Sequence, residues 1–187
     1  MSGADQISGG QRDLMTELDF TILAIVGRDG PLSAYDVRKV FSNSLTPTWS
    51  SSTGSVYPSI GRLESAALIL ASTPEGARSR KSLSITPEGR AALEPWLMNI
   101  TPDIAAATPD PIRTRMFFMM LVQPEQRPEL ISSALASTQA ALDRAEQLRL
   151  TRPQAQGSDL GRFASEGVVF ELRARLDWLH WLEEQLV

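Results

Sequence analysis

The 187-residue sequence contains no cysteine and a single histidine. Without cysteine the chain has no disulfides, no thiolate metal ligands and no cysteine nucleophile. The single histidine, His180, lies between Trp178 and Trp181, and the sequence arranges no second base or metal ligand around it, so we expect it to pack at a surface or interface. A glycine-rich phosphate loop of the usual spacing is also missing. We therefore predict that the protein is not an enzyme and carries neither a cofactor nor a metal ion.

Long hydrophobic runs are absent too, because no segment approaches the roughly 18 to 20 apolar residues of a membrane-spanning helix. The N-terminus lacks the basic-then-apolar order of a signal peptide, so we expect a cytoplasmic protein. Apolar residues make up 42% of the chain and charged residues 21%, which predicts a folded globular protein.

A net charge of −4 taken alone argues against a nucleic-acid partner. Residues 1–99 carry nine basic and ten acidic side chains, whereas residues 100–187 carry nine and twelve, so the acidity is concentrated in the second half. Within the first half, residues 76–86 contain Arg78, Arg80 and Lys81 and no acid. A local basic patch on an acidic protein is therefore expected.

Hydrophobic spacing in the first half predicts three helices, a β-hairpin and a fourth helix. Apolar residues from Leu14 to Val26 predict a first helix that stops at Gly27 and the turn Asp29-Gly30-Pro31. Ser33 is a candidate cap for a second helix that ends before Pro47. A third helix is predicted to begin near Thr53, with a bend or looser start caused by Pro58. Short runs at 69–73 and 79–85 predict the hairpin, and Thr86-Pro87 is a typical start for the fourth helix.

The second half is predicted to be helical only. Three prolines and several small residues at 99–111 indicate a domain boundary. Beyond it, the spacing predicts one helix from Asp110-Pro111 to near Pro124, a longer one that ends before Pro153, and a last one with its stripe at 169–186. We predict a flexible N-terminal arm at 1–12, a DNA-binding domain at 13–99, a linker at 100–111 and a helical dimerisation domain at 112–187.

Three helices followed by a hairpin is the order of the winged helix-turn-helix fold, so the fold class is mostly α with a small β-hairpin. The segments ILAIVGRDGPLSAYDVRKVF, GSVYPSIGRLESAALI, ARSRKSLSITPEGR and EPWL resemble the PadR family of winged-helix transcriptional regulators across residues 18–97. Ser33-Ala34-Tyr35 departs from the usual His-Gly-Tyr of that family, and Thr53 stands where a proline is usual.

The ending FELRARLDWLHWLEEQ resembles the longer, Vir-type subset of the family, whose extra helices form the dimer interface. The resemblance implies a DNA-binding regulator, commonly a repressor, whose dimeric helical region responds to a small molecule. We expect a homodimer on an inverted-repeat operator. The alternative is a winged-helix protein-interaction module that does not bind DNA, which the net acidity favours.

Candidate DNA-binding residues lie on the second helix, on the third helix and on the hairpin. The hydroxyls of Ser52, Thr53 and Ser55 at a helix N-terminus suit a phosphate, and capping of that helix is the alternative. The resemblance favours DNA contact by Tyr57, against packing on the second helix, and Tyr35 is a further candidate. Arg62 would contact a phosphate or a guanine edge, or remain a solvated surface charge. The basic residues of the hairpin, Arg78, Arg80 and Lys81, are expected at the DNA backbone, an ordinary charged hairpin tip being the alternative.

An effector, if one binds, is expected to be a small aromatic molecule where the fourth helix meets the C-terminal helices, near Trp96, Phe117, Met120 and Trp178. Trp and Phe supply flat faces, and methionines repack around ligands of different shape. The alternative is that these side chains only form the dimer core.

Overall fold

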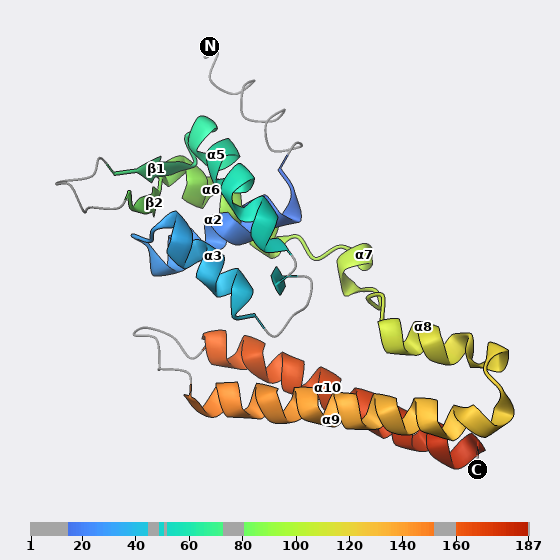
Figure 1. Cartoon of the computed structure of the whole chain (residues 1–187). Coiled ribbons are helices and arrows are strands. Elements are labelled where there is room, and N and C mark those ends of the chain that lie inside the picture. Colours follow the sequence, from blue (N-terminus) through green and yellow to red (C-terminus); the bar gives the residue numbers. More distant parts are fainter. Residues whose placement is uncertain (1–14, 45–48, 51, 73–80, 152–159, 187) are drawn as a thin grey trace. The chain divides into compact units, whose positions relative to one another are not determined.

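The computed structural model describes residues 15–44, 49–50, 52–72, 81–151 and 160–186 (Figure 1). The predicted N-terminal arm and the hairpin residues Arg78 and Arg80 lie outside the described residues. The chain divides into two compact units, residues 1–106 and residues 107–187. Among the helices of the described residues, none is both long enough and apolar enough to cross a membrane.

The described part of the first unit starts with two helices that each have a capping box. Helix α2 (Glu17–Asp29) has Thr16 as its N-cap, which exchanges hydrogen bonds with Asp19, and α3 (Ala34–Ser42) has the predicted cap Ser33, which exchanges them with Asp36. Helix α2 continues past Gly27 and ends at Asp29, the first residue of the predicted turn Asp29-Gly30-Pro31. A Cβ on Gly27 would lie 3.0 Å from Ile85 Cδ1, so this glycine serves close packing against the hairpin.

The predicted third helix consists of a 3₁₀ turn, η1 (Ser52–Ser55), followed by α5 (Val56–Ser65). The predicted start near Thr53 is therefore three residues early for the α-helix. The looser start expected from Pro58 matches the 3₁₀ turn before α5, and Pro58 itself lies in the first turn, where backbone N–H groups lack helical partners anyway. Beyond the helix, Ala67 adopts a left-handed conformation (φ 54°), and Leu68 N donates to the Leu63 carbonyl in a Schellman motif.

The hairpin pairs β1 (Ile69–Ala71) with β2 (Leu83–Ile85) antiparallel, with Leu70 opposite Ser84. Leu32, between α2 and α3, bridges to Leu83 and widens this small sheet. Helix α6 (Pro87–Met98) starts at the predicted cap Thr86, whose hydroxyl accepts from Gly89 N. A Cβ on Gly89 would collide with the Leu68 carbonyl, so only glycine lets α6 approach β1 this closely.

The core of the first unit lies between α2, α3, α5 and the hairpin. Its fully buried side chains come from every one of these elements: Ile22, Leu23, Val26, Val37, Phe41, Val56, Leu63 and Ile69. The predicted linker contains a short helix, α7 (Pro102–Ala105), with Thr101 as its cap.

The second unit is helical throughout the residues that the structure describes. Helix α8 (Pro111–Phe117) is followed by two 3₁₀ turns, η2 (Met119–Leu121) and η3 (Pro124–Gln126), and then by the long helices α9 (Arg127–Thr151) and α10 (Leu160–Leu186). The long helices lie side by side and antiparallel (Figure 1), with the ion pairs Arg149–Glu166 at 3.0 Å and Arg173–Glu146 at 2.7 Å. Asp110 caps α8 and pairs with Arg175 of α10 at 2.9 Å, which holds α8 on the long helices.

Candidate nucleic-acid interface

Helix α5 is the predicted recognition helix, and the inner face of this helix is fixed in the core. Val56, Ile60 and Leu63 are buried against α2 and α3. The chain before α5 is held as well, because Trp49 packs on Phe41 of α3 with ring centroids 5.2 Å apart. A helix anchored in this way presents its outer face in a defined position.

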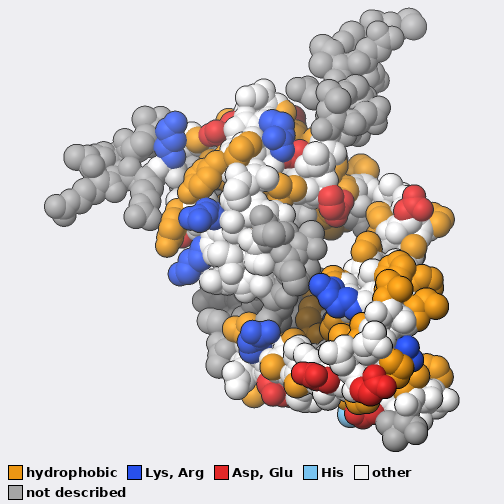
Figure 2. Space-filling model, turned by 45° about the vertical axis from the view of Figure 1, so that its right-hand side comes forward, with side chains coloured by type: hydrophobic (Ala, Val, Ile, Leu, Met, Phe, Trp, Pro, Cys, Tyr) orange, Lys and Arg blue, Asp and Glu red, His pale blue; other side chains and the backbone are white. Residues whose placement is uncertain are grey.

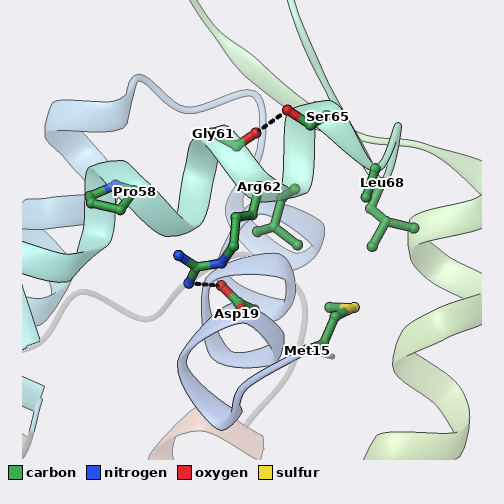
Figure 3. Close-up of a pocket in the computed structure, with 9 residues that line it drawn as sticks. Met15, Asp19, Pro58, Gly61, Arg62, Ser65 and Leu68 are labelled. Atoms are coloured by element: carbon green, nitrogen blue, oxygen red, sulfur yellow. Dashed lines mark hydrogen bonds and ion pairs between the residues drawn. The ribbon is translucent and has the colours of Figure 1, made fainter. Parts of the chain in front are cut away.

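An ion pair adds a polar anchor between α5 and α2. Arg62 extends from α5 to Asp19 on α2 (Figure 3), with its Nη2 2.6 Å from Asp19 Oδ1 and 2.7 Å from Ser59 Oγ. The Asp19 side chain is 2% exposed, whereas that of Arg62 is 53% exposed. Burial alone would raise the pKa of the Asp19 carboxyl, but hydrogen bonds from Arg62 and Thr16 outweigh burial and hold this pKa below its usual value.

Arg62 therefore has a structural partner that the sequence did not indicate. The two alternatives considered from sequence were a DNA contact and a solvated charge, and neither of them describes an ion pair with a buried carboxylate 43 residues away. The interaction links the orientation of α5 to the first turn of α2.

The outer face of α5 carries Tyr57, half of whose surface is exposed, with Pro58, Gly61 and Ser65 beside it. The alternative that Tyr57 packs on the second helix is not supported by this exposure. Nothing lies within 4 Å of the position where a Cβ on Gly61 would stand, so the middle of this face is open.

Serine and threonine side chains precede this face in η1. Ser52 and Thr53 are half-buried, whereas Ser55 is exposed at the N-cap position of α5. Within the described part of the chain, the Ser55 side chain makes no capping hydrogen bond with α5. The capping alternative is therefore wrong for Ser55, and its hydroxyl remains able to meet a phosphate oxygen.

Helix α3 contributes an exposed face on which the sequence analysis named Tyr35 but neither Arg38 nor Lys39. Tyr35, Arg38 and Lys39 are exposed and lie at helical spacing, on the side away from the buried Val37 and Phe41. In helix-turn-helix proteins the helix before the recognition helix crosses the DNA backbone, where cations neutralise phosphates. The adjacent pair Arg38-Lys39 on the polar face was the signal that could have indicated these residues.

Lys81 is the hairpin cation that the structure describes, and it is exposed two residues before β2. The strands at this point are held by Ser72 and Ser82, whose hydroxyl oxygens lie 2.9 Å apart. On the face seen in Figure 2, the blue basic side chains of the first unit stand apart among mostly uncharged surface, without forming one continuous patch.

The four predicted effector residues belong to different surroundings. In the first unit, Trp96 stacks on Phe20 with centroids 5.4 Å apart and donates to Glu17 Oε2 at 3.0 Å. In the second unit, Trp178 packs against the cluster of Met116, Met119, Ile131 and Leu179. Phe117 and Met120 face outward, 77% and 76% exposed. Trp178 thus packs within its own unit, whereas Phe117 and Met120 are surface residues of this unit.

Comparison with known proteins gives a consistent result. Residues 22–95 match the Transcriptional regulator PadR-like family. The negative transcriptional regulator PadR of Bacillus subtilis (strain 168) is 27% identical over 130 residues, which cover 68% of this chain and 70% of that protein.

Solved structures of Bacillus subtilis PadR share the fold. The complex with operator DNA has a TM-score of 0.77 at 21% identity and covers 91% of this chain and 99% of that one. The complex with p-coumaric acid has a TM-score of 0.74 at 22% identity and covers 90% and 98%. The predicted winged-helix fold with C-terminal helices is thereby confirmed.

Proposed function

We propose that the chain, whose residues 22–95 match the Transcriptional regulator PadR-like family, is a regulator of this kind and binds double-stranded DNA with α5 in the major groove. The observation that carries the proposal is the division of α5 into a fixed inner face and an open outer face with Tyr57 on it. Recognition helices need both, because base edges are contacted only by a helix held in register on the duplex.

Phosphate contacts come from the elements on either side of α5. Arg38 and Lys39 on α3 and Lys81 beside the hairpin are exposed cations, and Ser55 adds a hydroxyl at the start of α5. These groups carry no sequence information, but they position the protein and make its affinity depend on salt. Their presence supports DNA binding despite the net charge of −4.

The second unit is proposed to form a homodimer with two-fold symmetry. Most of the apolar stripe predicted at 169–186 packs within the chain itself and is not available to a partner. Val169, Leu176 and Leu179 of this stripe are buried against α9. A different set, Phe163, Phe170 and Trp181, remains more than half exposed on α10. Large exposed apolar side chains mark interaction sites, and a symmetric dimer would select an inverted-repeat operator.

We propose repression relieved by a small aromatic effector as the regulatory mode. The relative in Bacillus subtilis is a negative regulator, and its structures include one with p-coumaric acid. An effector releases DNA only if it binds better to a conformation with a different disposition of the two recognition helices.

The test is to sequence the genomic DNA fragments that the purified protein retains. We expect an inverted repeat enriched upstream of a small number of genes. Retained fragments without a shared motif, or no retention, would favour the alternative of a protein-interaction module. The net charge of −4 is the observation that supports this alternative.

A further inference from the structure

A cavity of about 540 Å³ lies beside the recognition helix, between α5 and the first turn of α2. Its walls are mostly apolar and include Met15, Pro58, Leu63 and Leu68, and the Asp19–Arg62 ion pair lies on it (Figure 3). The volume falls within the range of about 300 to 1,000 Å³ that small-molecule sites occupy. All of these residues belong to the first unit, so the cavity does not depend on the second one.

The charge that a ligand meets in this cavity is positive. Asp19 is almost fully buried, and its carboxylate already accepts from Thr16 N, Thr16 Oγ1 and Arg62 Nη2. Arg62 is half exposed, and among the described residues its hydrogen bonds come from Nη2 alone. Its remaining N–H groups suit an oxygen acceptor, and guanidinium groups bind carboxylates best.

We propose that this cavity binds a small amphipathic monoanion, with an apolar body between Met15 and Leu68 and a carboxylate on Arg62. The site is distinct from the region around Trp96, Phe117, Met120 and Trp178 that the sequence suggested. A carboxylate on the remaining N–H groups of Arg62 shares the guanidinium with Asp19, so binding places a second negative charge beside the polar link between α2 and α5. Any effect of this ligand on DNA binding rests on the proposed function, whereas binding of the ligand to the cavity does not.

Methionine methyl groups give a direct test on the full chain without DNA. Met15 lines the cavity, whereas Met116, Met119 and Met120 lie in the second unit, so a spectrum with ¹³C-methyl methionine separates the two places. The probe is 2-naphthoate, and its uncharged counterpart is 2-naphthamide. We expect 2-naphthoate to shift the Met15 resonance with saturation, and 2-naphthamide to bind more weakly.

Variants of the ion pair test the role of the guanidinium. Arg62→Gln is expected to weaken 2-naphthoate binding by about tenfold or more, because a hydrogen bond to a charged group usually contributes that much. Arg62→Lys keeps the cation and is expected to retain part of the affinity. The double variant Asp19→Asn/Arg62→Gln leaves no unpaired buried charge and should stay folded. Weak binding of 2-naphthoate by this variant is therefore due to the missing guanidinium and not to unfolding. The matched control is Arg28→Gln, which alters an exposed ion pair in the same unit and should bind like the unaltered protein.

The outcomes separate this proposal from the proposed function. Saturable Met15 shifts that depend on Arg62 support the cavity site even if the protein does not bind DNA. No Met15 shift, a shift confined to the methionines of the second unit, or equal binding of 2-naphthoate and 2-naphthamide would overturn the proposal even if DNA binding is found.

Discussion

Replacing Arg62 by alanine removes the cation that faces the buried carboxylate of Asp19 and leaves that carboxylate in place. Loss of one partner from a fully buried pair costs about 3 to 5 kcal/mol, whereas an exposed pair contributes about 1 kcal/mol or less. Asp19 is buried, but Arg62 is half exposed and Thr16 still donates to the carboxylate. We therefore expect the free energy of unfolding of the first unit to fall by about 2 kcal/mol, between the two limits.

Urea denaturation followed by the fluorescence of Trp96 measures this loss. Trp96 stacks on Phe20 and donates to Glu17, both of α2, so its emission reports the packing of the first unit. Changing Trp178 and Trp181 to phenylalanine removes the signal of the second unit and leaves Trp49 and Trp96, both in the first unit. A loss of about 2 kcal/mol lowers the melting temperature of a domain of this size by roughly 10 °C.

Arg28→Ala is the matched control, because Arg28 pairs with Asp29 at the same 2.6 Å but both side chains are more exposed than Asp19. Its expected cost is about 0.5 kcal/mol. Adding Asp19→Asn to Arg62→Ala should restore part of the stability, since no buried charge is then unpaired. Equal losses in Arg62→Ala and Arg28→Ala would refute the view that the Asp19 pair anchors α5.

Four further outcomes are expected. Tyr57→Ala should narrow the affinity gap between specific and random DNA, whereas Lys81→Ala should reduce the salt slope by about one for all sequences; unchanged affinity in both would remove both assignments. Asp19, with its lowered pKa, contributes stability that is present above about pH 4 and is lost as the pH falls through the folded-state pKa. Asp19→Asn should therefore make the urea-measured stability depend less on pH below about pH 4, and an equal acid dependence would contradict this. Ala67→Gly should raise stability by about 1 kcal/mol in the same assay by relieving the left-handed conformation, and a loss would show that the strain is absent. Deleting 160–187 removes α10 and should give a monomer or an insoluble product by size-exclusion chromatography; a folded dimer of full DNA affinity would place the interface elsewhere.

Helix starts were predictable where local chemistry decides them. Ser33 and Thr86 cap α3 and α6 through their own hydroxyls, and both starts were predicted from capping residues alone. The role of Gly27 was not predictable in this way, because this glycine packs closely against Ile85, 58 positions further along the chain. A glycine that ends a helix and one that packs closely look alike in a sequence.

The sequence predicted which helices and strands form the candidate site, but only some of the residues and contacts within it. The exposed Tyr57 follows from the apolar stripe of α5, which leaves that position outside. The partner of Arg62 does not, because no local pattern connects position 62 with position 19. Phe117 and Met120 illustrate the same limit, since the 3₁₀ turn η2 directs Met119 inward and leaves Met120 exposed in a region where the sequence predicted one continuous helix.

The central claim is DNA binding through α3, α5 and the hairpin, and the salt dependence of affinity tests it most directly. Fluorescence anisotropy with duplex DNA from upstream of the protein's own gene, and with random duplex, would be recorded at 50 and 200 mM salt. In the proposed dimer, Arg38, Lys39 and Lys81 of the two protomers would neutralise about six phosphates, so the affinity should fall about a thousandfold across this range. The upstream duplex should bind more tightly than the random one at both concentrations. No complex, or a complex whose affinity does not change with salt, would contradict the account.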